Sequence, residues 1–280
     1  KSLAAKNLNS SVEELETING EIFIKNNPSK KVSFTYLAQN NNLVETLKFK
    51  PRIKNSTEFK LIGKPVRNLD AEAKVTGKAL YSGDIKIPNM VYATIVRPDV
   101  YNSKKVSVDA SKLKDFEGAE LIEIKNLIAV VHNDPEISKK ASKKVKVTWK
   151  EPELNVNNET IFKHLEDTIQ EHKVYEKGGS LELGEQNSKT IVSANYEDGY
   201  KAHAPIETHT ATCYFKNKEL TIWTSCQTPF GIRSRLAKTL DISEENVHVK
   251  QIHLGGGFGG KISNEQATEA AQISKLCGKP

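Results

Sequence analysis

The stretch VHVKQIHLGGGFGGK, residues 247–261, contains the most informative pattern in this 280-residue chain. Its first half carries alternating valines and predicts a strand, and its second half sets five glycines around Phe258. Glycine tolerates positive φ and lets backbone amides approach a ligand without obstruction by side chains. A helix is predicted at about 264–276, and its positive N-terminal end favours a phosphate or pyrophosphate near the loop.

Several interpretations of this loop compete. It is not a Walker A loop, because Ile262 stands where that motif needs Ser or Thr. A GxGxxG register exists at Gly255, Gly257 and Gly260, but no βαβ series precedes it, so a dinucleotide-binding fold is a minor alternative. A glycine-rich turn without any ligand is a third interpretation. The bulky ring of Phe258 between glycines favours a wall against a flat ligand or cofactor.

Outward from the loop, short strands alternate with helices, which predicts an α+β fold. The C-terminal part is expected to contain a helix with Ile232, Leu236 and Leu240 on one face. The expected strands, placed from apolar runs and their turn residues, are 21–25, 79–81, 91–96, 119–124, 128–131, 145–149, 191–200, 210–215, 219–225 and 247–253. The expected helices are 12–15, 111–116, 135–144, 229–240 and 264–276, the first of them capped by residues 9–11.

Composition is ordinary for a soluble globular protein, with 37% hydrophobic and 27% charged residues and a formal net charge of +6. The densest basic cluster consists of Lys139, Lys140, Lys143, Lys144, Lys146 and Lys150. Neither a reading helix nor stacking aromatics accompanies it, so a solvated lysine-rich surface is expected and a nucleic-acid partner is not. No apolar run approaches the roughly 20 residues that a membrane span requires.

The cysteines and histidines do not form a metal-binding pattern. Cys213, Cys226 and Cys277 lack CxxC spacing, and the seven histidines are scattered without an HExxH motif. We therefore expect no metal that is bound directly by protein ligands.

Four segments in order resemble the xanthine dehydrogenase/aldehyde oxidase family of molybdenum hydroxylases. The run GGGFGGK at 255–261 resembles that family's molybdopterin loop, and residues 60–98 resemble the start of its α/β-hammerhead domain. Residues 201–213 resemble the strand turn ahead of the cofactor region, and residues 223–242 resemble the segment with a glutamine beside the molybdenum. Because the hammerhead features begin near residue 60, the large subunit of isoquinoline 1-oxidoreductase is the most similar subgroup.

The resemblance implies three parts of the chain. Residues 1–58 correspond to the tail of an upstream cofactor-binding segment, which residues 12–39 resemble, and a polar linker at 50–57. Residues 59–152 correspond to the hammerhead domain, and residues 153–280 to the first part of a truncated molybdopterin-binding domain of mixed sheets and helices. The chain is then a fragment of the enzyme.

The resemblance also implies which residues meet the cofactor. Gln227 matches the glutamine whose amide donates a hydrogen bond to an oxo ligand on molybdenum, and Phe258 and Gly259 match residues that flank the metal and the pterin. Gly256, Gly257 and Gly260 are expected to complete the backbone cradle. For His203 and Glu207 we favour structural hydrogen bonding, and for Arg233 a solvated helix position over contact with the cofactor's phosphate.

One departure from the family bears on the substrate. Purine-oxidising relatives have a glutamate after GGGFGGK, and this chain has Ile262 there. A buried isoleucine cannot accept a hydrogen bond from a purine N–H group, so an aldehyde or a less polar N-heterocycle is the expected substrate. The subgroup's arginines after GGGFG are replaced here by Gly260 and Lys261.

The implied activity is oxidation of such a substrate with oxygen from water, with electrons passing to iron–sulfur clusters. The family's catalytic base lies beyond these residues, so no catalytic residue is assigned, and the 280-residue chain alone is expected to be inactive and to bind the cofactor weakly or not at all. The full-length protein is expected to bind molybdopterin, as such or as a dinucleotide.

Expected partners are the rest of the large subunit and a small subunit or domain with two 2Fe–2S clusters. The family suggests a bacterial periplasmic or membrane-associated location, with the cytoplasm as the alternative. The competing hypothesis is a non-catalytic binding or scaffold domain that retains the glycine loop.

Overall fold

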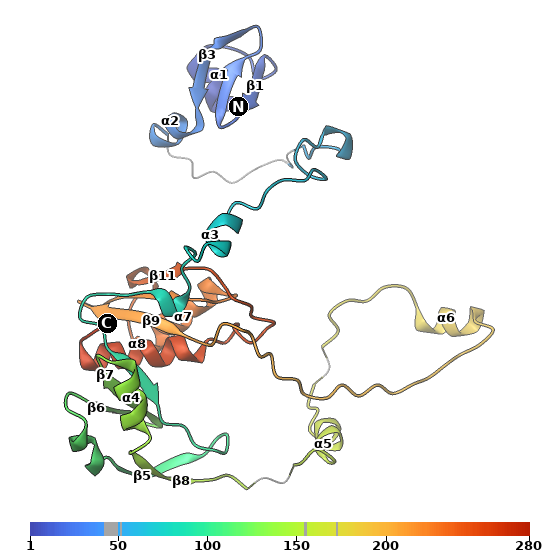
Figure 1. Cartoon of the computed structure of the whole chain (residues 1–280). Helices are drawn as coiled ribbons and strands as arrows, with labels where there is room; N and C mark the ends of the chain where they lie inside the picture. Colours follow the sequence, from blue (N-terminus) through green and yellow to red (C-terminus); the bar gives the residue numbers. More distant parts are fainter. Residues whose placement is uncertain (42–49, 51, 154–155, 172) are drawn as a thin grey trace. The chain divides into compact units, whose positions relative to one another are not determined.

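The computed structural model describes residues 1–41, 50, 52–153, 156–171 and 173–280 (Figure 1). The chain divides into two compact units, Lys1–Arg67 and Asn68–Pro280, and each is described by itself. Helices alternate with open sheets in both, which confirms the α+β prediction. The linker predicted at 50–57 and the polar boundary predicted after residue 152 fall partly on residues 51 and 154–155, which lie outside the described residues.

The first unit packs two helices on a three-stranded antiparallel sheet of order β1-β2-β3. Asn19 and Gly20 form the two-residue turn between β1 and β2, and both have the positive φ that such a turn requires. The core consists of Ala4, Leu15, Ile22, Val32 and Leu37. The elements are α1 (Ser2–Leu8), β1 (Leu15–Ile18), β2 (Glu21–Ile24), β3 (Asn27–Ser33), α2 (Phe34–Gln39) and the 3-10 helix η1 (Ser56–Glu58).

The helix predicted at residues 12–15 is wrong. The helix lies earlier, in α1, and Asn9 ends it in the left-handed conformation instead of capping the start of another. Glu14 then bonds back to the Ser10 hydroxyl and the Ser11 amide, which forms a turn that leads into β1. A short polar segment with local side-chain acceptors favours such a turn over a helix.

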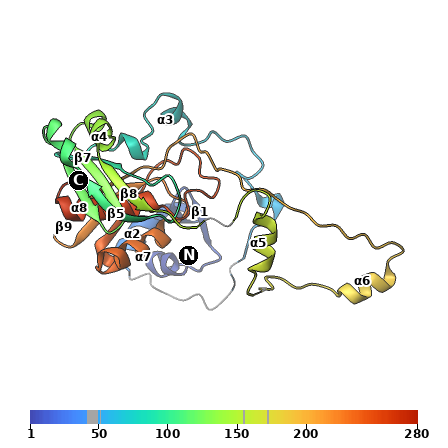
Figure 2. The same ribbon diagram turned by 90° about the horizontal axis from the view of Figure 1, so that it is seen from below.

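The second unit begins with a layer built on the sheet β4-β7-β6. Strand β7 is buried on both faces: Ile128 and Val130 face a core with α4, and Ala129 and Val131 face a core that includes Ile273 of α8. Helix α4 lies against β4 and β7 (Figure 1, Figure 2). The elements of this part of the chain are α3 (Ala71–Val75), η2 (Ser82–Asp84), which contacts β9 of the other sheet, β4 (Tyr92–Ile95), β5 (Lys104–Asp109), η3 (Ser111–Asp115), β6 (Glu120–Ile124), β7 (Leu127–His132), α4 (Pro135–Ser142) and β8 (Lys146–Lys150).

The remaining sheet has the order β11-β10-β9 and carries the glycine loop after its parallel strand β11. Strands β10 and β11 are connected through α7, and α7 and α8 pack together over the sheet. Leu220, Ile222, Leu236 and Leu240 form the centre of this core, as the helix periodicity predicted for α7. The elements are α5 (Ile161–Asp167), α6 (Leu181–Asn187), β9 (Ala211–Lys216), β10 (Glu219–Thr224), α7 (Pro229–Leu240), η4 (Glu244–Asn246), β11 (Val247–Gln251) and α8 (Glu265–Cys277).

Two predicted strands are absent from the described residues. Residues 79–81 run without strand pairing, and residues 191–200 form an exposed extended segment after α6. The Leu80 carbonyl accepts one backbone hydrogen bond, from the His253 N–H at 3.4 Å, but neither segment forms the ladder of backbone hydrogen bonds that a strand requires. Conversely, β5 was not predicted, because Lys104 and Lys105 obscure its alternation; it pairs with β8 and forms a two-stranded sheet.

The six clustered lysines around α4 and β8 are exposed, as expected of a solvated surface. Within the described ranges no helix combines the length and apolar character of a membrane span.

Candidate functional site

The glycine loop leaves β11 at Gln251 and turns sharply at residues 256–260. Gly256 has φ +93° and Gly259 has φ +96°, values that side chains rarely tolerate, so glycine is required at both positions. Phe258 also has a positive φ, +53°, and its ring is 76% exposed. A large exposed aromatic held in an unfavourable backbone conformation indicates a functional position rather than a packing one.

Gln227 lies beside this loop, in the connection between β10 and α7. Its Oε1 accepts hydrogen bonds from the backbone N–H groups of Gly259, at 3.1 Å, and Lys261, at 3.3 Å. Its own backbone N–H donates to the Lys261 carbonyl at 3.1 Å. The approach is close enough that a Cβ at Gly257 would lie 2.6 Å from Oε1. Because both acceptor contacts use the oxygen, the amide nitrogen of Gln227 is oriented away from them as a free donor.

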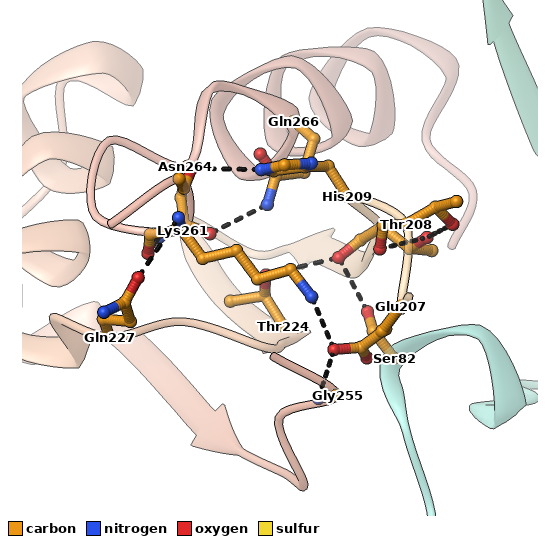
Figure 3. A network of polar contacts seen from close by, with 12 residues as sticks. Ser82, Glu207, Thr208, His209, Thr224, Gln227, Gly255, Lys261, Asn264 and Gln266 are labelled. Atoms are coloured by element: carbon orange, nitrogen blue, oxygen red, sulfur yellow. Dashed lines mark hydrogen bonds and ion pairs between the residues drawn. The ribbon is translucent and has the colours of Figure 1, made fainter. Parts of the chain in front are cut away.

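Glu207 and Lys261 form an ion pair at the base of the loop (Figure 3). Lys261 Nζ lies 2.6 Å from Glu207 Oε2, and the Lys261 side chain is fully buried. The same carboxylate oxygen accepts the Gly255 N–H at 2.8 Å. Burial by itself would raise the pKa of Glu207, but the Lys261 ammonium and the Gly255 amide hold that pKa below its ordinary value.

Two histidines line the glycine turn from the segment ahead of β9. His203 lies against Gly259 and Gly260, where an added Cβ would come within 3.3 Å and 3.0 Å of its ring. His209 donates from Nε2 to the Gly260 carbonyl at 3.0 Å. These contacts leave no room for side chains in the turn, so the cradle depends on glycine at those positions.

The hydrogen bonds within the loop decide which of its amides remain free. The N–H groups of Gly255, Gly259, Gly260 and Lys261 are all used by acceptors inside the loop or beside it. In the described part of the chain, no acceptor is present for the N–H groups of residues 256–258. Three consecutive backbone donors and the Gln227 amide nitrogen therefore have no partner among the described residues, and the exposed Phe258 ring lies in the same turn.

The structure brings together all six residues predicted for cofactor binding: Gln227, Gly256, Gly257, Phe258, Gly259 and Gly260. Glu207 makes the structural hydrogen bonds that were favoured for it, and Arg233 donates to the Glu244 carbonyl, away from the loop. The prediction that Ile262 is buried is wrong, because its side chain is 50% exposed. Ile262 follows the tight turn, and only Lys261 of this pair points into the core.

Sequence reasoning missed the residues that hold the loop from beneath. Lys261 entered it only as the last residue of the GGGFGGK run and as a departure from the subgroup's arginines, with no role assigned to its side chain. Asn264 donates to the Lys261 carbonyl, and Arg235 donates to the Ser263 carbonyl, so both fix the turn between the loop and α8. The one available signal was a lysine that directly follows a glycine run with a glutamate upstream, a pattern that does not by itself predict burial.

The described residues offer hydrogen-bond donors at this site but no metal-binding cluster of three or more His, Cys, Asp or Glu side chains. Cys213 and Cys226 are buried free thiols, and burial raises the pKa of both. A donor-rich, glycine-lined surface with a flat exposed ring is suited to an oxygen-rich or anionic flat ligand.

Comparison with known proteins gives a family match for the part of the chain that contains this loop. Residues 163–280 match the sequence model of the molybdopterin cofactor-binding domain. Proteins similar to the chain at low identity include a xanthine dehydrogenase/oxidase of Mus musculus and aldehyde oxidase 2 of Macaca fascicularis.

The individual relatives have low sequence identity to this chain. The chain is 23% identical to a nicotinate dehydrogenase chain of Pseudomonas putida over 291 aligned residues, covering 99% of this chain and 24% of the relative. It is 24% identical to the nicotinate dehydrogenase large molybdopterin subunit of Eubacterium barkeri, covering 80% of this chain and 61% of the relative. The aldehyde oxidoreductase structure from Desulfovibrio gigas shares the fold, with a TM-score of 0.61 at 19% identity over 75% of this chain and 29% of the other. The chain thus spans less than two thirds of the length of each.

Proposed function

We propose that this chain forms one wall of the cofactor site in a molybdenum hydroxylase that oxidises an aldehyde or an N-heterocycle. One observation carries the proposal: Glu207, Gln227 and the Gly257 carbonyl accept the amides of residues 255 and 259–261, whereas the amides of 256–258 and the Gln227 amide nitrogen have no partner among the described residues. A loop that served only as a turn would not need this arrangement of unused donors around an exposed ring.

The residues present fit a pterin that carries molybdenum. The cradle is open because Gly257 lacks the Cβ that would collide with Gln227, and the exposed Phe258 ring offers a flat packing surface. When bound, the cofactor would supply the oxygen transfer and accept the substrate's electrons. The protein environment that this chain would give the metal consists of hydrogen-bond donors.

In this proposal each side chain has a defined task. Gln227 donates from its amide nitrogen to an oxygen acceptor of the cofactor, and the loop fixes that nitrogen's direction by holding the amide oxygen. The free amides at 256–258 orient the cofactor by backbone donation. Phe258 excludes water from one side of the reacting centre. No residue in the chain is assigned as the catalytic base.

The substrate class follows from what the site lacks. Ile262 is half-exposed and offers no acceptor to a purine N–H group, which favours an aldehyde or a less polar N-heterocycle. Two relatives are named nicotinate dehydrogenases, after an N-heterocyclic substrate. We further propose the subgroup of the isoquinoline 1-oxidoreductase large subunit, because the hammerhead-like residues begin near residue 60.

The proposal includes an assembly larger than this chain. It comprises the remainder of a large subunit, which would contribute the base and further pterin contacts, and a small protein or domain with two 2Fe–2S clusters. A periplasmic or membrane-associated location is proposed with it, and the cytoplasm is the alternative.

Substitution of Gln227 by Glu tests the proposal sharply. Glutamate retains the oxygen that accepts from Gly259 and Lys261 but replaces the free N–H₂ donor by an oxygen. In the complete enzyme we expect dye-linked oxidation of aldehydes or N-heterocycles to fall by about 100-fold, the effect of removing one preorganised donor. The unfolding midpoint is expected to change little. Gln186→Glu, at an exposed position of α6, is the matched control.

Molybdenum content and activity separate this proposal from the scaffold alternative. Wild-type protein without molybdenum, measured by mass spectrometry of the metal, would favour the scaffold. A Gln227→Glu enzyme with full activity would contradict the donor role.

A further inference from the structure

We infer that the buried ion pair between Lys261 and Glu207 is a positioning element: it ties the two ends of the glycine loop together and thereby sets the geometry of its free amides. Neither residue faces the exposed surface of the loop. The consequence for a bound cofactor rests on the proposed function, whereas the consequence for the loop itself does not.

Glu207 forms hydrogen bonds with both backbone groups of Gly255, the first glycine of the loop. Its Oε2 accepts the Gly255 N–H at 2.8 Å, and its backbone N–H donates to the Gly255 carbonyl at 3.2 Å. A Cβ at Gly255 would lie 2.5 Å from the Glu207 Cβ, so the two segments are in direct contact. The start of the loop is therefore fixed to Glu207.

Lys261 holds the other end. Its N–H donates to Gln227 Oε1 at 3.3 Å, and its carbonyl accepts from the Gln227 backbone and from Asn264. Its side chain then runs beneath the loop and places Nζ 2.6 Å from Glu207 Oε2. Lys261 thus connects the end of the loop, the Gln227 segment and the start of the loop (Figure 3).

This tether fixes the span over which residues 256–260 must turn. With both ends held, the amides at 259–261 reach their acceptors, and those at 256–258 keep no acceptor among the described residues. The side chain of Lys261 has no exposed surface and that of Glu207 is only 13% exposed, so solvent screens their attraction weakly. Loss of the tether would let the two ends separate while the core beneath, formed by α7, α8 and the sheet, stays packed.

A purely structural role and a positioning role predict different behaviour in a double variant. Removing one partner of a buried ion pair leaves an uncompensated charge and destabilises the fold, whereas removing both charges is often neutral. In Glu207→Gln combined with Lys261→Met, the glutamine oxygen can still accept the Gly255 N–H, so only the tether is lost.

The experiment uses the complete enzyme with Lys261→Met, Glu207→Gln and the double variant. The unfolding midpoint, the molybdopterin content per protein and amide hydrogen exchange in residues 254–262 are measured. We expect each single variant to lower the midpoint and the double variant to recover it. In the double variant, pterin content should remain at least about 10-fold below wild type, the usual scale for loss of residues that orient a metal site's ligands. Exchange in 254–262 should be faster than in wild type.

The exposed pair Lys31–Glu21, changed to Met and Gln in the same way, is the control and should alter none of these quantities. A double variant with wild-type pterin content and unchanged exchange would overturn the inference and reduce the pair to a structural role. If wild-type enzyme contains no pterin, the proposed function fails, and exchange in 254–262 alone decides whether the pair positions the loop.

Discussion

Substitution of Gly257 by alanine should separate cofactor binding from folding. The alanine Cβ would lie 2.6 Å from Gln227 Oε1 and 2.8 Å from its Cδ, distances that atoms cannot keep. The backbone of residue 257 does not require positive φ, so the alanine itself is not strained. The clash is with the far end of a flexible side chain, and the expected response is that the Gln227 amide swings away.

The structure allows the two effects of this change to be estimated separately. Moving Gln227 breaks its bonds to the Gly259 and Lys261 amides, each worth about 0.5–1.5 kcal/mol. Because Gln227 is exposed, water replaces part of this loss, and we expect the free energy of unfolding to fall by about 1 kcal/mol. Molybdenum content or activity should fall far more, by about 10- to 100-fold, since the donor has left its position.

The assay combines chemical denaturation with metal analysis of the same purified enzyme. Gly231→Ala is the matched control, because Gly231 lies in α7 and a Cβ there would meet only ordinary contacts at 3.7 Å or more. It should stabilise the protein by about 0.5–1 kcal/mol and leave molybdenum unchanged. Gly257→Ala enzyme with wild-type molybdenum and activity would refute the close approach of Gln227 to the loop.

Two further predictions concern pH and the core. The pKa of Glu207 is lowered in the folded protein, so its contribution to stability is fully present above its ordinary value of 4.5 and is lost as pH falls through the lower folded pKa. Below pH 4.5 the stability difference between wild type and Glu207→Gln should therefore shrink, as followed by thermal unfolding; a constant difference would contradict the ion pair. Leu236→Ala should destabilise by about 2–5 kcal/mol in urea because Leu236 is fully buried, and Leu181→Ala, at an exposed position, should stay within about 0.5 kcal/mol.

The sequence was most informative where local pattern and burial coincide. Pro229–Leu240 forms a helix with the predicted bounds, because Pro229 begins it and the apolar residues recur on the face that meets the core. The strand before the glycine loop and the helix after it were likewise predicted from alternation and from the loop itself. Each of these signals lies within one element and needs no knowledge of its neighbours.

The features that were predicted wrongly or missed depend on contacts between elements that are distant in sequence. The apolar run at 191–200 predicts a strand, but a strand also requires a partner, and no sequence rule supplies one. In the same way, a lysine after a glycine run is expected to be solvated, and Lys261 is buried only because Glu207, 54 residues away in sequence, receives its charge. The tether of the loop is a tertiary feature that local reasoning does not reach.

The distribution of hydrogen bonds in the loop connects these observations to the proposed function. Gln227 has one oxygen and one nitrogen on its amide, and the loop occupies the oxygen twice. Because Gln227 and Glu207 accept the amides of Gly255, Gly259 and Lys261, one side-chain donor and three backbone donors are left without a partner among the described residues. A site that binds its ligand through donors is favoured when nearby acceptors are already hydrogen-bonded, because a free acceptor facing the ligand would repel an anionic or oxygen-rich group. The buried ion pair beneath the loop contributes to this arrangement. Glu207 accepts the Gly255 N–H, and Lys261 neutralises the charge of Glu207, so that no net negative charge lies behind the cradle.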